Sequence, residues 1–351
     1  MTSGALGRLI EEDGLRGMTS NPSLFEKAIV ESHVYDDEIH ALALQGKSVG
    51  EIYDALSQRD VQSAADLFRP LYDKTDAHDG YVSLEVNPHL AHDTDGTVRE
   101  ARRLWIAVNR PNVLIKVPAT VEGLPAIQHL ISEGININVT LLFGVSRYCQ
   151  VAEAYMTGIE ALLAQKNAVS HVASVASFFV SRIDVRVDPI LESVLRDRDH
   201  AAELMESLCG HVAIASAKIA YQRYKRLFNT ARFKTLSDQG ARCQRLLWAS
   251  TAAKNPAYCD VKYIEALIGR DTIDTAPLGL LEAFRDHGVV KASLEEEIFT
   301  AARVLKRLPR LGIDMDRVAQ QLENEGVAQF NVAFDKLMET LASRVTEIQG
   351  H

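Results

Sequence analysis

The sequence lacks the features that mark several classes of protein. None of its apolar runs approaches the length of a membrane span, and the N-terminus does not show the charged and then apolar pattern of a secretory signal. The four cysteines (Cys149, Cys209, Cys243 and Cys259) lie far apart and without the C-x-x-C spacing of metal sites. Unclustered cysteines are typical of a reducing compartment. We therefore expect a cytoplasmic protein with no membrane partner.

Positive charge is also scarce in this chain. Its 38 Lys and Arg residues stand against 47 Asp and Glu residues, which gives a net charge of −9. No cluster of Lys and Arg appears, and this argues against nucleic acid as a partner. The eleven histidines show no pair at the spacing of metal ligands. A small anionic substrate remains compatible with the composition, because a few local cations can outweigh the global charge.

What the sequence does contain is a regular alternation of short apolar segments and amphipathic helical segments. The seven predicted strands are residues 15–20, 81–86, 113–118, 135–143, 171–180, 245–250 and 271–276. Strands that alternate with helices predict a parallel sheet wrapped by helices. The number of strands favours a (β/α)₈ TIM barrel over an open doubly wound sheet, and no glycine-rich dinucleotide motif follows a strand. A closed barrel needs eight strands, so one is not recognisable.

The helices are predicted from amphipathic segments and from the residues that begin and end them. We expect a helix over 2–13, one that begins at Ser23, and two or three within 32–76 with Ser48 and Asp60 as N-caps. A long helical region is predicted from about Pro189 to Asn229, with a break near Cys209 and Gly210. The tail over 278–349 is also predicted to be helical, with breaks at Pro309 and Gly312. The chain is predicted to form a single domain, 1–351, in which the C-terminal helices (about 280–351) cover the barrel.

The sequence PNVLIKVPAT, residues 111–120, holds one charged residue inside an apolar strand. Burial of an unpaired ammonium group is costly, so Lys116 must extend to solvent at the strand end, have a charged partner, or be neutral with a lowered pKa. A neutral amine in an apolar pocket is a nucleophile that can form a Schiff base with a carbonyl. This stretch alone favours the position at the strand end.

Polar side chains follow the predicted strands at their C-terminal ends, where TIM barrels place their reacting groups. They are Thr19, Asn21, Glu85, Asn87, Lys116, Thr120, Asn138, Thr140, Ser177, Arg182, Ser250, Lys254 and Asp274. Glu85 is expected to be buried and to need a partner or a raised pKa. Asn138 and Thr140 alternate with apolar residues and so face one side of their strand. Asn21 and Pro22 are also explained by a plain turn.

Several stretches together resemble the transaldolase family, in its longer bacterial and plant-like branch. They are EEDGLRGMTSNPSLFEKAI, YVSLEVNPHLAHDT, PNVLIKVPAT, INVTLLF, VASFFVSRIDVRVDP and LLWASTAAKNPAYCDVKY, and they cover almost the whole chain. The resemblance implies a TIM barrel of the class I aldolase type. It also implies a Schiff-base mechanism without a metal or another cofactor.

The reaction that the resemblance implies belongs to the non-oxidative pentose phosphate pathway. A dihydroxyacetone unit passes from a ketose phosphate (sedoheptulose 7-phosphate or fructose 6-phosphate) to an aldose phosphate (glyceraldehyde 3-phosphate or erythrose 4-phosphate). By resemblance, Lys116 is the Schiff-base lysine, and Glu85 and Thr140 work with a catalytic water. Asn21 and Asn138 bind the hydroxyl groups, and Ser177 lines the same pocket, where we also expect Thr19. The phosphate site contains Arg182 and Ser250.

The chain departs from the family pattern at two places. The shorter transaldolases have a second phosphate-site arginine two residues after the serine, and Ala252 stands there in this chain. Lys254 is the nearest cation, and we expect it to bind phosphate as a point charge. The family's first strand also carries a catalytic aspartate, which Asp13 does not replace. Either the polypeptide begins upstream of Met1, as we expect, or the chain is a truncated, catalytically impaired homologue that binds sugar phosphates. The genomic frame upstream of the Met1 codon tests this.

A lysine aldolase that cleaves its substrate without transfer is the remaining enzymatic alternative. The two activities are separated by whether an aldose phosphate acceptor is needed. Sugar phosphates are the only expected partners, and the sequence is compatible with either a monomer or a homodimer.

Overall fold

The computed structural model describes residues 4–31, 33–196 and 201–349, and these include seven strands. They are β1 (Gly17–Thr19), β2 (Tyr81–Glu85), β3 (Val113–Pro118), β4 (Ile137–Leu142), β5 (Ser174–Phe179), β6 (Arg245–Ala249) and β7 (Thr272–Asp274). They follow chain order in the sheet, and the pairs β1–β2, β2–β3, β5–β6 and β6–β7 are parallel. The predicted α/β class and all seven predicted strands are confirmed.

The chain divides into two compact units, which we describe separately. Unit 1 consists of Met1–Val117, Val121–Asn138 and Val327–His351, and unit 2 consists of Pro118–Thr120 and Val139–Gly326. In unit 1, β1, β2 and β3 lie in parallel register, with Gly17 opposite Tyr81 and Glu85 opposite Lys116. Residues that are partners in register project to the same face of a sheet.

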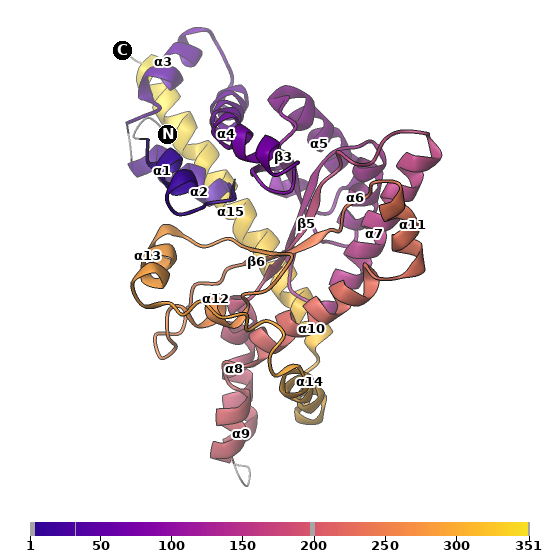
Figure 1. Cartoon of the computed structure of the whole chain (residues 1–351). Helices are drawn as coiled ribbons and strands as arrows, with labels where there is room; N and C mark the ends of the chain where they lie inside the picture. The colour runs from indigo at the N-terminus through magenta and orange to yellow at the C-terminus, as the bar shows by residue number, and fades with distance from the viewer. Residues whose placement is uncertain (1–3, 32, 197–200, 350–351) are drawn as a thin grey trace. The chain divides into compact units, whose positions relative to one another are not determined.

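The helices of unit 1 are close to those predicted. They are α1 (Ala5–Glu11), α2 (Pro22–Glu31), α3 (Asp36–Leu44), α4 (Val49–Lys74), the 3₁₀ helix η1 (Pro88–Leu90), α5 (Thr94–Val108), α6 (Gly123–Ser132) and the C-terminal part of α15 (Met315–Gln349). The end of α15 packs on α2, α3 and α4 around an apolar cluster that includes Ile29, Ile39, Ile52, Leu337 and Leu341 (Figure 1). This contact buries apolar side chains that the amphipathic helices could not bury alone.

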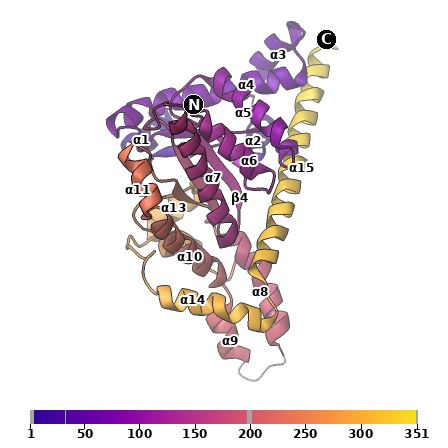
Figure 2. The same ribbon diagram turned by 90° about the vertical axis from the view of Figure 1, so that its right-hand side faces the viewer.

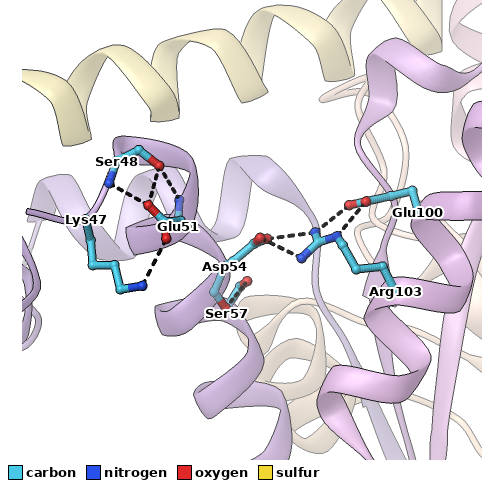
Figure 3. Close-up of polar contacts among 7 residues, drawn as sticks. All are labelled: Lys47, Ser48, Glu51, Asp54, Ser57, Glu100 and Arg103. Atoms are coloured by element: carbon cyan, nitrogen blue, oxygen red, sulfur yellow. Dashed lines mark hydrogen bonds and ion pairs between the residues drawn. The ribbon is translucent and has the colours of Figure 1, made fainter.

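The start of α4 confirms one predicted N-cap and corrects the other. The Ser48 side chain accepts a hydrogen bond from the Glu51 N–H, and the Glu51 carboxylate accepts one from the Ser48 N–H, which forms a capping box (Figure 3). Asp60 is not an N-cap, because α4 continues through it for 26 residues in all. Its carboxylate instead accepts a hydrogen bond from Tyr35 Oη, at 2.5 Å.

Ion pairs hold α4 against α5 at the surface of unit 1. Arg103 of α5 donates to both carboxylate oxygens of Asp54 on α4, at 2.6 and 3.0 Å, and also to Glu100 on its own helix (Figure 3). The two-pronged geometry matches the guanidinium fork to the carboxylate. Helix α4 also packs against β2, the strand that carries Glu85.

Unit 2 contains the end of β4, the strands β5, β6 and β7, and the helices that follow them. The helices are α7 (Val145–Ala164), α8 (Ser181–Leu195), α9 (Ala201–Leu208), α10 (Val212–Leu227), α11 (Ala231–Asp238), α12 (Lys262–Ala266), α13 (Leu278–His287), α14 (Ile298–Arg307), the 3₁₀ helix η2 (Leu308–Leu311) and the start of α15. Helix α14 packs against α10 (Figure 2). The predicted breaks at Gly210 (φ 71°) and Gly312 (φ 76°) are confirmed.

Two predicted helix boundaries in unit 2 are wrong. Helix α8 begins at Ser181 rather than near Pro189, because the buried row of Ile183, Val187 and Leu191 continues on one face across the proline. The tail is not helical throughout, since residues 288–297 separate α13 from α14. Among the described residues, no helix combines the length and the apolar character that a membrane span requires.

Candidate active site

Lys116 is buried in unit 1, where the residue is 5% exposed. Its Nζ atom donates hydrogen bonds to the Ser20 carbonyl oxygen and to Glu85 Oε2, each at 3.2 Å. The ammonium group also lies 5.9 Å from the centroid of the Phe330 ring, within the range of a cation–π contact. The interpretation that Lys116 extends to solvent at the strand end is therefore wrong, and the alternative of a charged partner is confirmed.

Glu85 owes its place beside Lys116 to the sheet register. The two residues face one another across β2 and β3, so their side chains leave the same face of the sheet. Burial raises the pKa of the Glu85 carboxyl, and the ammonium group of Lys116 opposes that rise. Oε1 of Glu85 is buried and has no hydrogen-bond partner among the described residues. A carboxyl with one unused oxygen beside a buried amine has the capacity to exchange a proton with a third group.

A second row of polar side chains lies on the same side of unit 1. Asn138 Nδ2 donates to Ser83 Oγ at 3.0 Å, and Ser20 Oγ donates to the Ser83 carbonyl oxygen at 2.9 Å. Ser83 is two residues before Glu85 and therefore shares its face of β2. Thr19 is opposite Ser83 in register, and Asn21 follows β1. Lys116, Glu85 and Asn138 thus belong to one polar cluster. Thr19 at the end of β1 and Asn21 just after it lie beside the strand that carries Ser83 and Glu85.

The predicted phosphate-binding residues lie in unit 2, where β5 and β6 end. Ser250 has φ 57°, a left-handed backbone that is unusual for a residue other than glycine and is often found at functional sites. Its Oγ is 3.0 Å from Ser181 Oγ, and its carbonyl oxygen accepts a hydrogen bond from the Ser181 N–H. Arg182, the second residue of α8, packs its guanidinium group 5.7 Å from the Phe179 ring. Burial lowers the pKa of Arg182, and the Glu325 carboxylate opposes this.

The other predicted residues of unit 2 differ in their surroundings. Thr140 is buried in β4, where its carbonyl oxygen accepts a hydrogen bond from the Ala119 N–H at 2.8 Å. Ser177 is buried in β5, opposite Leu247 in register. Lys254 is exposed in the loop after β6.

The structure adds four residues that the sequence did not single out. Ser20 and Phe330 contact Lys116, Ser83 contacts Asn138, and Ser181 contacts Ser250. Ser83 could have been found, because the alternation in β2 places it on the face of Glu85. No pattern within the sequence pairs Phe330 of α15 with a lysine more than two hundred positions away.

The chain is similar to known proteins over almost its whole length. The family model described as Transaldolase/Fructose-6-phosphate aldolase matches residues 2–341. A protein of Trichodesmium erythraeum named "Transaldolase" is 46% identical over 351 residues, which cover 99% of this chain and 92% of that protein. A "Transaldolase" of Saccharopolyspora erythraea is 43% identical (99% and 92% covered), and a "Transaldolase 2" of a Nostoc species is 44% identical (98% and 91% covered). The chain belongs to the transaldolase/fructose-6-phosphate aldolase family.

Proposed function

We propose that this protein is a transaldolase that transfers a dihydroxyacetone unit between sugar phosphates through a Schiff base on Lys116. The observation that carries the proposal is the buried amine of Lys116 beside Glu85, whose second carboxylate oxygen is unused. The relatives named as transaldolases, aligned over almost the whole chain, support the same reaction. Donors are sedoheptulose 7-phosphate or fructose 6-phosphate, and acceptors are glyceraldehyde 3-phosphate or erythrose 4-phosphate.

In the proposed reaction, the Lys116 amine adds to the ketose carbonyl, and loss of water gives an iminium ion. The iminium nitrogen accepts the electron pair of the adjacent C–C bond as that bond breaks, so an enamine remains and an aldose phosphate leaves. The enamine carbon then attacks the aldehyde of the acceptor. Hydrolysis of the new iminium ion releases the product ketose and restores Lys116.

Each of these steps moves a proton, and Glu85 is suited to this role. Burial raises the pKa of the Glu85 carboxyl, so this pKa is closer to neutral pH than the pKa of an exposed glutamate. We propose that Glu85 Oε1 and Thr140 bind the water that transfers protons to and from the substrate. Positioned acid–base catalysis of this kind contributes about 10²–10⁴-fold in rate.

The remaining predicted residues are proposed to position the substrate. Asn21, Asn138, Thr19 and Ser177 would bind the hydroxyl groups of the dihydroxyacetone unit, for which amide and hydroxyl side chains supply both donors and acceptors. Arg182 would bind the phosphate through charge-assisted hydrogen bonds, together with Ser250 and with Lys254 as a point charge. Such anchoring places the reacting carbon against the nucleophile.

The test is transfer from fructose 6-phosphate to erythrose 4-phosphate, with sedoheptulose 7-phosphate as the measured product. A transaldolase forms this product and releases little glyceraldehyde 3-phosphate when the acceptor is left out. Release at the same rate without acceptor would instead indicate an aldolase that cleaves without transfer. Stabilisation by sugar phosphates without turnover would indicate an impaired homologue that only binds them.

The organisation and location of the protein are also proposals. We propose that residues 1–351 act as one (β/α)-barrel domain, in which the C-terminal helices from about 280 cover the barrel. The free thiols of the four cysteines support a cytoplasmic location, because a reducing compartment keeps cysteines in this state. Sugar phosphates are the proposed partners, and the protein would act as a monomer or a homodimer.

A further inference from the structure

Three residues with metal-binding side chains meet at the surface of unit 2. Cys259 and Asp260 lie in the turn before α12, and His287 is the last residue of α13. Their ligand atoms all lie within 4.8 Å of one another, and all three side chains are exposed. Among the described residues, this is the one group of three or more His, Cys, Asp or Glu side chains that converges in this way.

The distances within this cluster are close to those around a tetrahedral zinc ion. Bond lengths of about 2.3 Å to sulfur and about 2.0 Å to nitrogen and oxygen separate a sulfur and an oxygen ligand by about 3.5 Å, and a nitrogen and an oxygen ligand by about 3.3 Å. In the structure, Cys259 Sγ lies 3.7 Å from Asp260 Oδ1, and His287 Nε2 lies 2.9 Å from that oxygen. Small side-chain rotations therefore suffice to surround an ion.

The second nitrogen of His287 has the partner that zinc-binding histidines usually have. Nδ1 of the ring is 3.2 Å from Asp286 Oδ2, and Nε2 faces the other two ligands. A carboxylate that accepts a hydrogen bond from one ring nitrogen fixes the tautomer in which the other nitrogen binds the metal. The Asp286 carboxylate and the His287 ring thus already have the relative arrangement that a zinc-binding histidine needs.

We propose that Cys259, Asp260 and His287 bind one zinc-class divalent cation at the surface of unit 2. The mixture of sulfur, nitrogen and oxygen ligands suits Zn²⁺ and Co²⁺ better than Mg²⁺ or Ca²⁺, which prefer oxygen alone. On binding, the Cys259 thiol loses its proton to solvent, and the fourth coordination position is left for water. The bound ion would tie the turn before α12 to the end of α13.

The experiment uses the full chain without a histidine tag, stripped of metal with a chelator and titrated with Co²⁺. We expect binding to saturate at one ion per chain, with a thiolate-to-cobalt absorption band that Zn²⁺ then removes. Cys259→Ser should abolish the band, and Cys259→Ser and His287→Gln should each weaken binding by about tenfold or more. Asp286→Asn should keep the band but weaken binding by about tenfold. Cys149→Ser is the matched control and should match the parent chain.

Two results would overturn the proposal. One is a titration without a thiolate band or without saturation at one ion, and the other is a band that persists in Cys259→Ser. The side chains of Cys259, Asp286 and His287 are exposed, so far-ultraviolet circular dichroism should show the same fold for the variants at these positions. The spectrum of the Cys149→Ser control, whose side chain is half-buried, is compared in the same way. Lost binding in a variant with an unchanged spectrum is therefore lost coordination.

Discussion

Lys116 in unit 1 and Lys218 in unit 2 are buried to almost the same extent, at 5% and 6% exposure, yet they are held by different groups. Lys218 of α10 donates to the carbonyl oxygens of Ser293 and Glu296, at 3.0 and 2.8 Å, in the segment between α13 and α14. Lys116 donates to one carbonyl oxygen and to a carboxylate that keeps one oxygen unused.

The difference shows what burial of a lysine does and does not indicate. Two backbone carbonyl groups compensate the buried charge of Lys218 and hold a loop, which is a structural role. In the proposed mechanism, Glu85 instead takes up or gives away a proton beside Lys116, and the Lys116 amine is the nucleophile. The group that faces a buried lysine is therefore more informative than burial alone.

The largest expected effect is on turnover when each lysine is replaced by methionine. Lys116→Met removes the nucleophile and should lower the rate of transfer by about 10⁴-fold or more, as measured in the sedoheptulose 7-phosphate assay. Lys218→Met should leave turnover within about threefold at temperatures where the variant is folded. Equal losses of turnover in the two folded variants would show that Lys116 and Lys218 do not differ in their role in the reaction.

The second effect concerns the carboxyl beside Lys116. Glu85→Gln preserves size but cannot exchange a proton, so turnover should fall by about 10²–10⁴-fold. The contribution of Glu85 to the pH profile of turnover should disappear with it. A variant with the parent's rate and pH profile would show that Glu85 only fills space. Glu51→Gln, at the surface of α4, serves as the control and should leave turnover unchanged.

The third effect is on stability, and it concerns Lys218, the lysine whose replacement should leave turnover almost unchanged. Lys218→Met leaves two carbonyl oxygens in the 288–297 segment without their donor, and should lower the free energy of unfolding by about 1–3 kcal/mol. Urea unfolding followed by circular dichroism measures this. An unchanged midpoint would mean that Lys218 does not hold this segment.

The fourth prediction extends the comparison to Asp274, a carboxyl with one unpaired buried oxygen in unit 2. Burial raises its pKa to about 7, although Thr251 donates a hydrogen bond to Oδ1. Between about pH 4 and 7 the folded state keeps a proton that the unfolded chain has lost, so the free energy of unfolding falls as pH rises. Asp274→Asn should remove a fall of about 1 kcal/mol per pH unit over this range, because the amide has no charge to bury. Parallel pH curves for the two proteins would contradict the assignment.

The smallest effect is expected far from either lysine, at the capping box of α4. Ser48→Ala should lower the free energy of unfolding by about 1 kcal/mol without a change in turnover, since the Glu51 N–H loses its acceptor. Thermal unfolding measures the first expectation and the transfer assay the second. Ser63→Ala, inside the same helix and exposed, is the matched control with a smaller effect.

The sequence was sufficient for much of this account because its signals are local. Apolar runs predict all seven strands. The rule that TIM barrels place their reacting groups at the C-terminal ends of strands predicts that Glu85 and Lys116 lie at the same edge of the sheet, and the register of β2 and β3 agrees. The predictions that helices start at Asp60 and near Pro189 are wrong, because the apolar faces of α4 and α8 continue through these residues. The Phe330 ring near Lys116 and the carbonyl groups around Lys218 could not be predicted, because tertiary packing alone brings them there.

The most direct test of Lys116 as the nucleophile is reduction with borohydride in the presence of fructose 6-phosphate, followed by mass mapping of peptides. We predict a dihydroxyacetone adduct on the peptide that contains Lys116 and none on the peptide that contains Lys218. An adduct that keeps the whole sugar phosphate would mean that the iminium ion forms but cleavage stalls. No adduct on Lys116 in folded, active protein, or an equal adduct on Lys218, would contradict the account.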